Sequence, residues 1–160
     1  MTIQPGERLP DVTLTRMGPN GPEPVRISEL TKGRKVVIFA LPGAFTPTCS
    51  AKHLPGFLDK LDEIRARGVD TVACLSVNDA FVMDAWARDQ GVDGRIEMLA
   101  DGNAEFTRAV GLEMDASGFG MGVRSQRYAM IVNDGVVEKL FVEKPGEFAV
   151  SSAEYVLENL

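Results

Sequence analysis

Residues 36–49 read VVIFALPGAFTPTC, an apolar run followed by a turn that contains two prolines and a glycine. An unbroken apolar run rich in β-branched residues is typical of a strand buried on both faces of a sheet. The segment that follows has apolar residues three and four positions apart, which predicts an amphipathic helix from Pro47 to about Arg67. Thr46 suits the N-cap of that helix, and Pro47 suits its first position. The stretch therefore predicts a strand, a sharp turn and a helix.

Cys49 is the third residue of the predicted helix and so lies in its first turn. Backbone N–H groups are unpaired there, and the positive end of the helix dipole favours an anion. Both effects stabilise a thiolate, which is the reactive form of cysteine. A lone cysteine is more often a small buried hydrophobic residue. In this setting, however, the sequence favours a nucleophilic sulfur.

The rest of the chain alternates strands and helices without repeats or linkers, which predicts one α/β domain over residues 1–160 with a mixed sheet covered by helices on both faces. The sequence Asn133-Asp134-Gly135 is a strong hairpin signal, and Asn78 is a candidate helix cap for an apolar stripe of Phe81, Val82, Ala85 and Trp86. The predicted strands are 11–16, 35–41, 71–77, 97–100, 128–132 and 136–142; the predicted helices are 47–67, 78–90, 104–110 and 151–160, with a turn region at 19–24 and a single helical turn from 28 to 30.

Composition narrows the class of protein. With 44% hydrophobic and 25% charged residues and a net charge of −6, the chain is an ordinary globular protein without the basic surface that nucleic acids need. No apolar stretch is long enough to span a membrane, and residues 1–7 do not resemble a signal peptide. Two cysteines do not make a disulfide scaffold. We expect a reducing compartment, most simply the cytoplasm. The alternative of an organelle, reached with a transit peptide that was removed before Met1, stays open.

The residues around Cys49 also carry a resemblance. Pro42, Thr46 and Cys49 reproduce the PxxxTxxC pattern of peroxiredoxins, and the stretch PGAFTPTCSAKHLPGF (42–57) is similar to the peroxiredoxin-5, or type II, branch. Segments 74–82 and 124–129 agree, and the similarity runs from about Asp11 to the C-terminus. The resemblance implies a thioredoxin-like fold, thiol-dependent peroxidase activity and a homodimer.

The chemistry implied by this resemblance is the reduction of hydrogen peroxide or a small organic hydroperoxide by the Cys49 thiolate, which becomes a sulfenic acid. Such a reaction needs hydrogen-bond donors along the O–O axis and exclusion of water. We expect Thr46 to hold a peroxide oxygen and to accept a capping bond, and Pro42 to supply apolar cover. The resemblance places Arg127 at the thiolate, where its charged fork suits two acceptors; Arg124 is a supporting candidate. No metal, flavin or haem is expected.

Three other interpretations stay open on the sequence alone. His53, the only histidine, lies four residues after Cys49, so a cysteine hydrolase with His53 as base is one alternative; catalytic Cys–His pairs usually come from separate elements, and packing is the commoner role. A redox sensor that is oxidised without turnover is the second. The third is nucleotide binding by the glycine-rich segment 118–122, but this segment lacks the spacing and the lysine of a phosphate-binding loop.

Cys74 lies in the middle of a predicted buried strand and is either a resolving cysteine or an inert thiol. We expect the inert thiol, since a residue there cannot reach a helix N-terminus without local unfolding. Some peroxiredoxin-5-like enzymes carry a resolving cysteine near the C-terminus, but here the comparable region 145–154 has Ser151 and Ser152 instead. The prediction is a one-cysteine cycle in which an external thiol, from a glutathione/glutaredoxin or thioredoxin system, restores Cys49.

Overall fold

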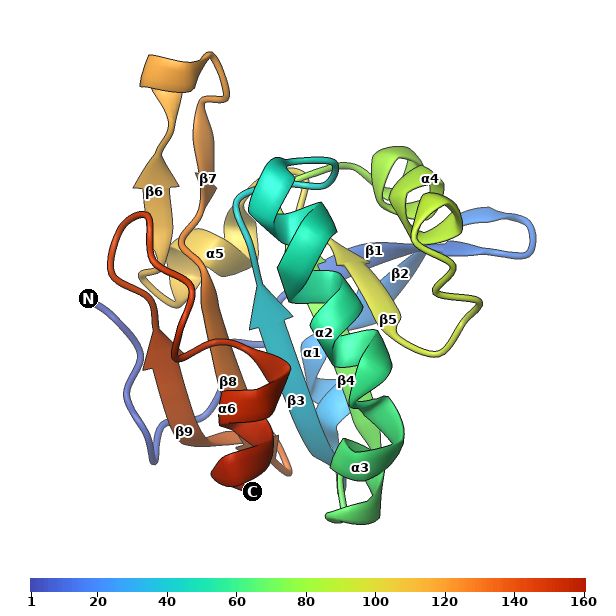
Figure 1. Cartoon of the computed structure of the whole chain (residues 1–160), viewed down its shortest axis with the longest axis vertical. Coiled ribbons are helices and arrows are strands. Elements are labelled where there is room, and N and C mark those ends of the chain that lie inside the picture. The colour runs from blue at the N-terminus through green and yellow to red at the C-terminus, as the bar shows by residue number, and fades with distance from the viewer.

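The computed structural model describes all 160 residues and arranges them around a seven-stranded mixed sheet (Figure 1). The strands are β1 (Thr13–Gly18), β2 (Gly21–Arg26), β3 (Lys35–Ala40), β4 (Thr71–Ser76), β5 (Glu97–Ala100), β6 (Glu113–Asp115), β7 (Val123–Ser125), β8 (Tyr128–Asn133) and β9 (Val136–Val142). The helices are α1 (Ile27–Thr31), α2 (Leu54–Asp59), α3 (Leu61–Ala66), α4 (Ala80–Asp89), α5 (Glu105–Ala109) and α6 (Ala153–Glu158), together with a π-helical turn η1 (Cys49–His53) and a 3-10 turn η2 (Ser117–Phe119).

The sheet has the order β2-β1-β5-β4-β3-β8-β9. Strands β3, β4 and β5 are parallel to one another, and the other pairings are antiparallel. Alternate residues of β3 pack on opposite faces: Val37 and Phe39 face the layer of α2, α3, α4 and α6, whereas Val36 and Ile38 face α1 and α5. The expected thioredoxin-like fold, with a mixed sheet covered on both faces, is confirmed. No helix is both long and apolar enough to cross a bilayer.

The predicted turn region at 19–24 is wrong over most of its length. Only Pro19 and Asn20 turn the chain, and residues 21–26 form β2, which pairs antiparallel with β1. Pro22 and Pro24 suggested a loop, but β2 lies at the edge of the sheet. A proline there costs no ladder hydrogen bond, since one side of an edge strand has no partner.

The predicted helix from Pro47 to Arg67 begins at the expected residue but is interrupted twice. Residues 49–53 form a π turn in which the Leu54 N–H donates to the Cys49 carbonyl, five residues earlier. Pro55 has no N–H to donate, and its ring crowds the carbonyl of the preceding turn, so a widened turn relieves the clash. The second break is at Lys60, where α2 ends and α3 follows.

Two details of α4 differ from expectation. Asp79, not Asn78, is the N-cap, because its side chain accepts a hydrogen bond from the Val82 N–H. The buried face consists of Ala80, Met83 and Trp86, while Phe81 points into solvent. Of the predicted stripe, Trp86 is buried and Val82 packs against the core, whereas Phe81 and Ala85 are exposed.

The segment between α5 and β8 forms an arm that the sequence did not predict. Strands β6 and β7 pair antiparallel, and the glycine-rich segment 118–122 is the turn at the tip of this arm (Figure 1). The expected hairpin of β8 and β9 is present, with Asp134 and Gly135 both at positive φ in the turn.

Candidate active site

Strand register brings Arg127 to the end of β3, where the chain turns toward Cys49. Ala40 of β3 pairs with Tyr128 of β8, and Tyr128 in turn pairs with Val142 of β9. Arg127, one residue before Tyr128, therefore lies beside the turn that follows β3. Its carbonyl accepts a hydrogen bond from the Glu143 N–H at 3.0 Å, which fixes its backbone to the other neighbouring strand.

The Arg127 guanidinium contacts Cys49 and His53 with its two terminal nitrogens. Nη2 donates to the Cys49 Sγ at 3.1 Å, and Nη1 lies 2.7 Å from the His53 Nδ1. Cys49 is fully buried, so this fixed positive charge acts on the sulfur in surroundings that screen it weakly. The contact that the resemblance implied between Arg127 and Cys49 is present in the structure.

His53 is fully buried and held at both ring nitrogens. The Ser151 carbonyl, 2.9 Å from Nε2, can only accept, so Nε2 carries the hydrogen; Arg127 can only donate, so Nδ1 is bare. Burial, and then the nearby Arg127 charge, lower the pKa of His53 from 6.5 to about 3. His53 is thus a neutral acceptor for Arg127 and has no free nitrogen for the Cys49 thiol. This arrangement removes the geometric basis of the cysteine hydrolase interpretation.

Aromatic rings enclose this histidine. Phe39 and Phe148 lie with their ring centroids 5.0 and 5.1 Å from that of His53, and Phe57 stacks on Phe39 at 4.0 Å. The Phe148 ring also lies under the Arg127 guanidinium, 5.8 Å from its carbon. Apolar surroundings of this kind strengthen the polar contacts of the arginine by excluding water.

The turn between β3 and the helix contains Pro42 and Thr46, seven and three residues before Cys49. The Thr46 hydroxyl donates to the Gly43 carbonyl at 2.7 Å and makes no capping bond to the helix, so the expected capping bond is absent. Its oxygen keeps lone pairs free. Arg124 does not bond Cys49; it donates to the carbonyls of Pro42 at 3.2 Å and Met121 at 3.1 Å and so ties this turn to the arm.

Sequence reasoning missed two groups that hold the site. The Asn78 side-chain oxygen accepts bonds from the Ala44 N–H at 3.0 Å and the Ser76 hydroxyl at 2.6 Å, which anchors the turn to the end of β4. The Trp86 indole donates to the Ser50 hydroxyl at 3.0 Å, next to Cys49. Asn78 follows a strand in the manner of a helix cap, and nothing in the sequence distinguishes the two roles.

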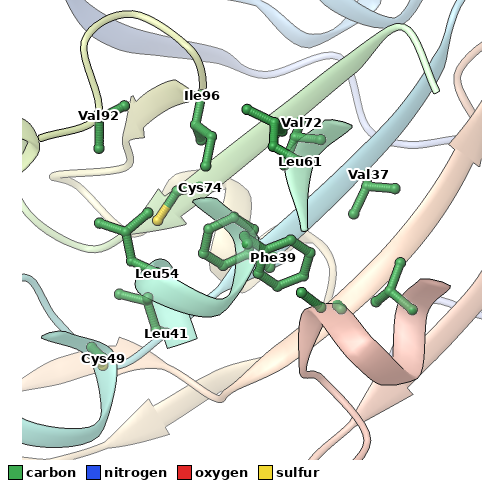
Figure 2. Packing of buried hydrophobic residues seen from close by; sticks show 14 of the residues in the cluster. Val37, Phe39, Leu41, Cys49, Leu54, Leu61, Val72, Cys74, Val92 and Ile96 are labelled. Carbon is green, nitrogen blue, oxygen red and sulfur yellow. The ribbon is translucent and has the colours of Figure 1, made fainter. Parts of the chain in front are cut away.

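Cys74 lies in β4, fully buried and on the same side of the sheet as Cys49. In Figure 2 the side chains of Leu41 and Leu54 lie between the two cysteines, and neither cysteine is in a disulfide. Burial, and then the nearby Cys49 sulfur, raise the pKa of the Cys74 thiol well above its ordinary value. These are the surroundings of a packed, unreactive thiol.

A groove of about 360 Å³ opens beside the site. Pro42, Thr48 and Arg127 line part of it, the base of the arm forms one wall, and the segment 143–148 after β9 forms the other. Neither at this site nor elsewhere in the fold are three His, Cys, Asp or Glu side chains arranged to hold a metal ion.

Comparisons with known proteins define the class of this site. The Redoxin family model matches residues 4–157. The chain is 55% identical to Peroxiredoxin-2E-2, chloroplastic, of Oryza sativa subsp. japonica, over 99% of this chain and 73% of that protein. It is 53% identical to reduced Prx3 in complex with H2O2 from Vibrio vulnificus, with a TM-score of 0.95 and 99% of each chain covered. Peroxiredoxin 5 from Alvinella pompejana matches with 35% identity and a TM-score of 0.84, over 98% of this chain and 96% of that one.

The chain therefore belongs to the Redoxin family. Within that family it is a peroxiredoxin of the peroxiredoxin-5-like branch, and so a thiol-dependent peroxidase. The resemblance inferred from residues 42–57 is confirmed.

The burial of neutral His53 predicts a pH-dependent stability. Unfolded His53 binds a proton below its ordinary pKa of 6.5, whereas folded His53 stays neutral down to about 3, so stability is lost as the pH falls below 6.5. Between pH 7 and pH 5 the loss from this group alone is about 2 kcal/mol. Urea denaturation at both pH values measures it. His53→Gln, which can still donate to Ser151 and accept from Arg127, should lose correspondingly less; an equal loss in both proteins would contradict the neutral assignment.

Proposed function

We propose that Cys49 is the nucleophile that reduces hydrogen peroxide and small organic hydroperoxides. The observation that carries the proposal is the contact of 3.1 Å between the Arg127 Nη2 and the Cys49 Sγ, with Arg127 also lining a groove. A permanently charged donor at the sulfur stabilises the thiolate and remains available to a peroxide oxygen. That a relative with 53% identity is titled as a complex with H2O2 supports the same substrate class here.

In the proposed reaction the Cys49 thiolate attacks one peroxide oxygen, and the O–O bond breaks. The sulfur gains the S–O bond of a sulfenic acid, and the second oxygen leaves as hydroxide or alkoxide, which takes up a proton to become water or an alcohol. In this proposal Arg127 donates to the oxygen on which charge develops. The Thr46 oxygen, whose hydrogen is donated to the Gly43 carbonyl, accepts from the O–H of the peroxide. Pro42 lines the groove and offers no competing N–H.

Arg124 enters this proposal as a supporting residue only. Its bonds to the Pro42 and Met121 carbonyls brace the turn from outside. A Cβ at Gly43 would lie 2.6 Å from the Arg124 Nη1, so the absence of a side chain at Gly43 makes room for the brace.

For the second half of the cycle we assign an external thiol. The sulfenic acid condenses with it to a mixed disulfide and water, and a second thiol then releases Cys49. A glutathione/glutaredoxin or a thioredoxin system supplies such thiols, and the groove beside Arg127 gives them an approach. Two free, buried cysteines fit a reducing compartment, for which we retain the cytoplasm, while the names of two relatives place those proteins in the chloroplast.

The roles of Cys49 and Arg127 are tested by two substitutions. Cys49→Ser should abolish peroxide turnover, since a serine hydroxyl is hardly ionised at neutral pH. Arg127→Lys should slow the peroxide step by about a hundredfold, because an ammonium cannot hold the sulfur and His53 together. Stopped-flow kinetics with hydrogen peroxide measure both. A rate near that of the wild type in Arg127→Lys would rule out the role given to this residue.

The one-cysteine cycle is tested by Cys74→Ser. This variant should keep most of its turnover with a glutathione/glutaredoxin or thioredoxin system, because Cys74 lies within β4 and burial raises the pKa of its thiol. It should be less stable by about 1 kcal/mol, since a hydroxyl is placed among apolar side chains. Intact-mass analysis after one equivalent of peroxide plus glutathione should show a mixed disulfide at Cys49. A dominant Cys49–Cys74 disulfide, with turnover lost in Cys74→Ser, would contradict the assignment.

We also propose that two copies of the chain associate, as the family resemblance implies. Phe45 and Phe81 are large exposed hydrophobic residues, and the bond of Asn78 to Ala44 keeps their segments together at one end of the molecule. Sedimentation at micromolar concentration should give twice the 17.3 kDa of one chain, and Phe81→Glu should lower that mass. A single 17.3 kDa species of the unaltered protein would refute the dimer.

A further inference from the structure

Glu143 is a buried carboxylate that the proposed reaction does not use. It follows β9, its N–H bonds the carbonyl of Arg127, which precedes β8, and only 7% of it is exposed. One carboxylate oxygen, Oε2, accepts three hydrogen bonds: from the Ala149 N–H at 2.7 Å, the Ser151 N–H at 2.8 Å and the Ser151 hydroxyl at 2.7 Å. Burial opposes ionisation, but the bonds from Ser151 and Ala149 outweigh it and lower the pKa of Glu143 below its ordinary value.

These three bonds hold the loop 144–152 that connects β9 to α6. Within the loop, the backbone makes one bond of its own, from the Glu147 N–H to the Lys144 carbonyl. A loop with so few internal bonds owes its conformation to the groups that fix its two ends. Here Glu143 lies at the start of the loop and reaches forward to residues near its end.

The held loop supplies two of the groups that position the catalytic arginine. The Ser151 carbonyl accepts from the His53 Nε2 at 2.9 Å and so fixes the tautomer that accepts from Arg127. The Phe148 ring packs against both His53 and Arg127. A continuous series of contacts therefore runs from Glu143 through Ser151, His53 and Arg127 to the Cys49 sulfur.

We infer that Glu143 is a positioning residue for the peroxide reaction, which acts by holding the loop 144–152 against His53 and Arg127. The inference rests on the proposed role of Arg127 at Cys49. The Glu143 backbone N–H bonds the Arg127 carbonyl, but its carboxylate bonds only Ala149 and Ser151. The effect of the carboxylate therefore reaches the sulfur through the geometry of the guanidinium.

Asp101 provides a matched control elsewhere in the fold. It is also buried, and its carboxylate accepts two backbone N–H bonds, from Phe106 and Thr107, and one hydroxyl bond from Thr107 at 2.7 Å. These bonds hold the start of α5, on the other face of the sheet from Cys49. Loss of a buried carboxylate at either place removes similar bonds, but only the carboxylate of Glu143 bonds the loop that contacts His53 and Arg127.

The experiment measures single-turnover oxidation of Cys49 by hydrogen peroxide. The fluorescence of Trp86, the only tryptophan, reports the reaction because its indole bonds Ser50 beside Cys49. Glu143→Ala should slow oxidation by about tenfold or more, since small displacements of a catalytic group have large effects on rate. Glu143→Gln should recover part of the rate, because its amide oxygen can still accept.

The controls separate a positioning role from a loss of stability. Asp101→Asn and Thr107→Val should lower the unfolding temperature while the oxidation rate stays within about twofold of the wild type. Ser151→Ala removes one bond to Glu143 and should slow oxidation by about threefold while the protein stays folded, so the test stands even if Glu143→Ala does not fold.

The Arg127→Lys background decides how Glu143 acts. In the Arg127→Lys protein, Glu143→Ala should slow oxidation by no more than about twofold further, because the guanidinium that Glu143 positions is already absent. Equal slowing in both backgrounds, or unchanged oxidation in Glu143→Ala and Ser151→Ala, would overturn the inference. If Arg127→Lys itself has no effect on the rate, the proposed function fails first, and the two failures are thus distinguished.

Discussion

The rest of the site depends on the fork of Arg127, which holds the Cys49 sulfur with one nitrogen and His53 with the other. A guanidinium is planar, so fixing one nitrogen on a rigid acceptor also fixes the direction of its neighbour. His53 can be that acceptor only while it is neutral and its Nε2 hydrogen is directed elsewhere, which the Ser151 carbonyl ensures. The low pKa of His53 is therefore part of the same arrangement, because a protonated ring would repel the arginine.

The fold delivers this arrangement through the register of three strands. The last residues of β3 and β9 pair with the first residue of β8, so these three strand ends lie at the same level. The turn that follows β3 and leads to Cys49 therefore lies beside Arg127, which precedes β8, and Arg127 lies beside Glu143, which follows β9. The sequence could predict β3, the β8–β9 hairpin and the start of the helix, since long apolar runs and turn residues are strong local signals. It could not predict β2 or the π turn, because edge pairing and the clash around Pro55 arise only when the elements are assembled.

The candidate site was predictable to different degrees. Cys49 follows from its place after a buried strand, and Arg127 came from the family resemblance. The roles of His53 and Asn78 were not predictable, because each depends on a partner far away in the sequence. The carboxylate of Glu143 bonds residues six and eight positions later, but these lie in a loop that has no sequence pattern of its own. His53 lies on the same turn as Cys49, and sequence spacing alone suggested a direct pair. In the structure Arg127, which precedes β8, bonds both side chains, and no local sequence pattern indicates this long-range contact.

The most direct test of the account is the protonation state of the single histidine, measured by 15N nuclear magnetic resonance at neutral pH on the reduced protein. One histidine gives one pair of ring nitrogen signals, so no assignment problem arises. The account predicts a neutral ring that carries its hydrogen on Nε2 and none on Nδ1. The Nδ1 signal should shift in Arg127→Ala, because this nitrogen then loses the hydrogen bond from Arg127. A hydrogen on Nδ1, or an imidazolium at pH 7, would show that Arg127 is not held in this way and would contradict the central claim.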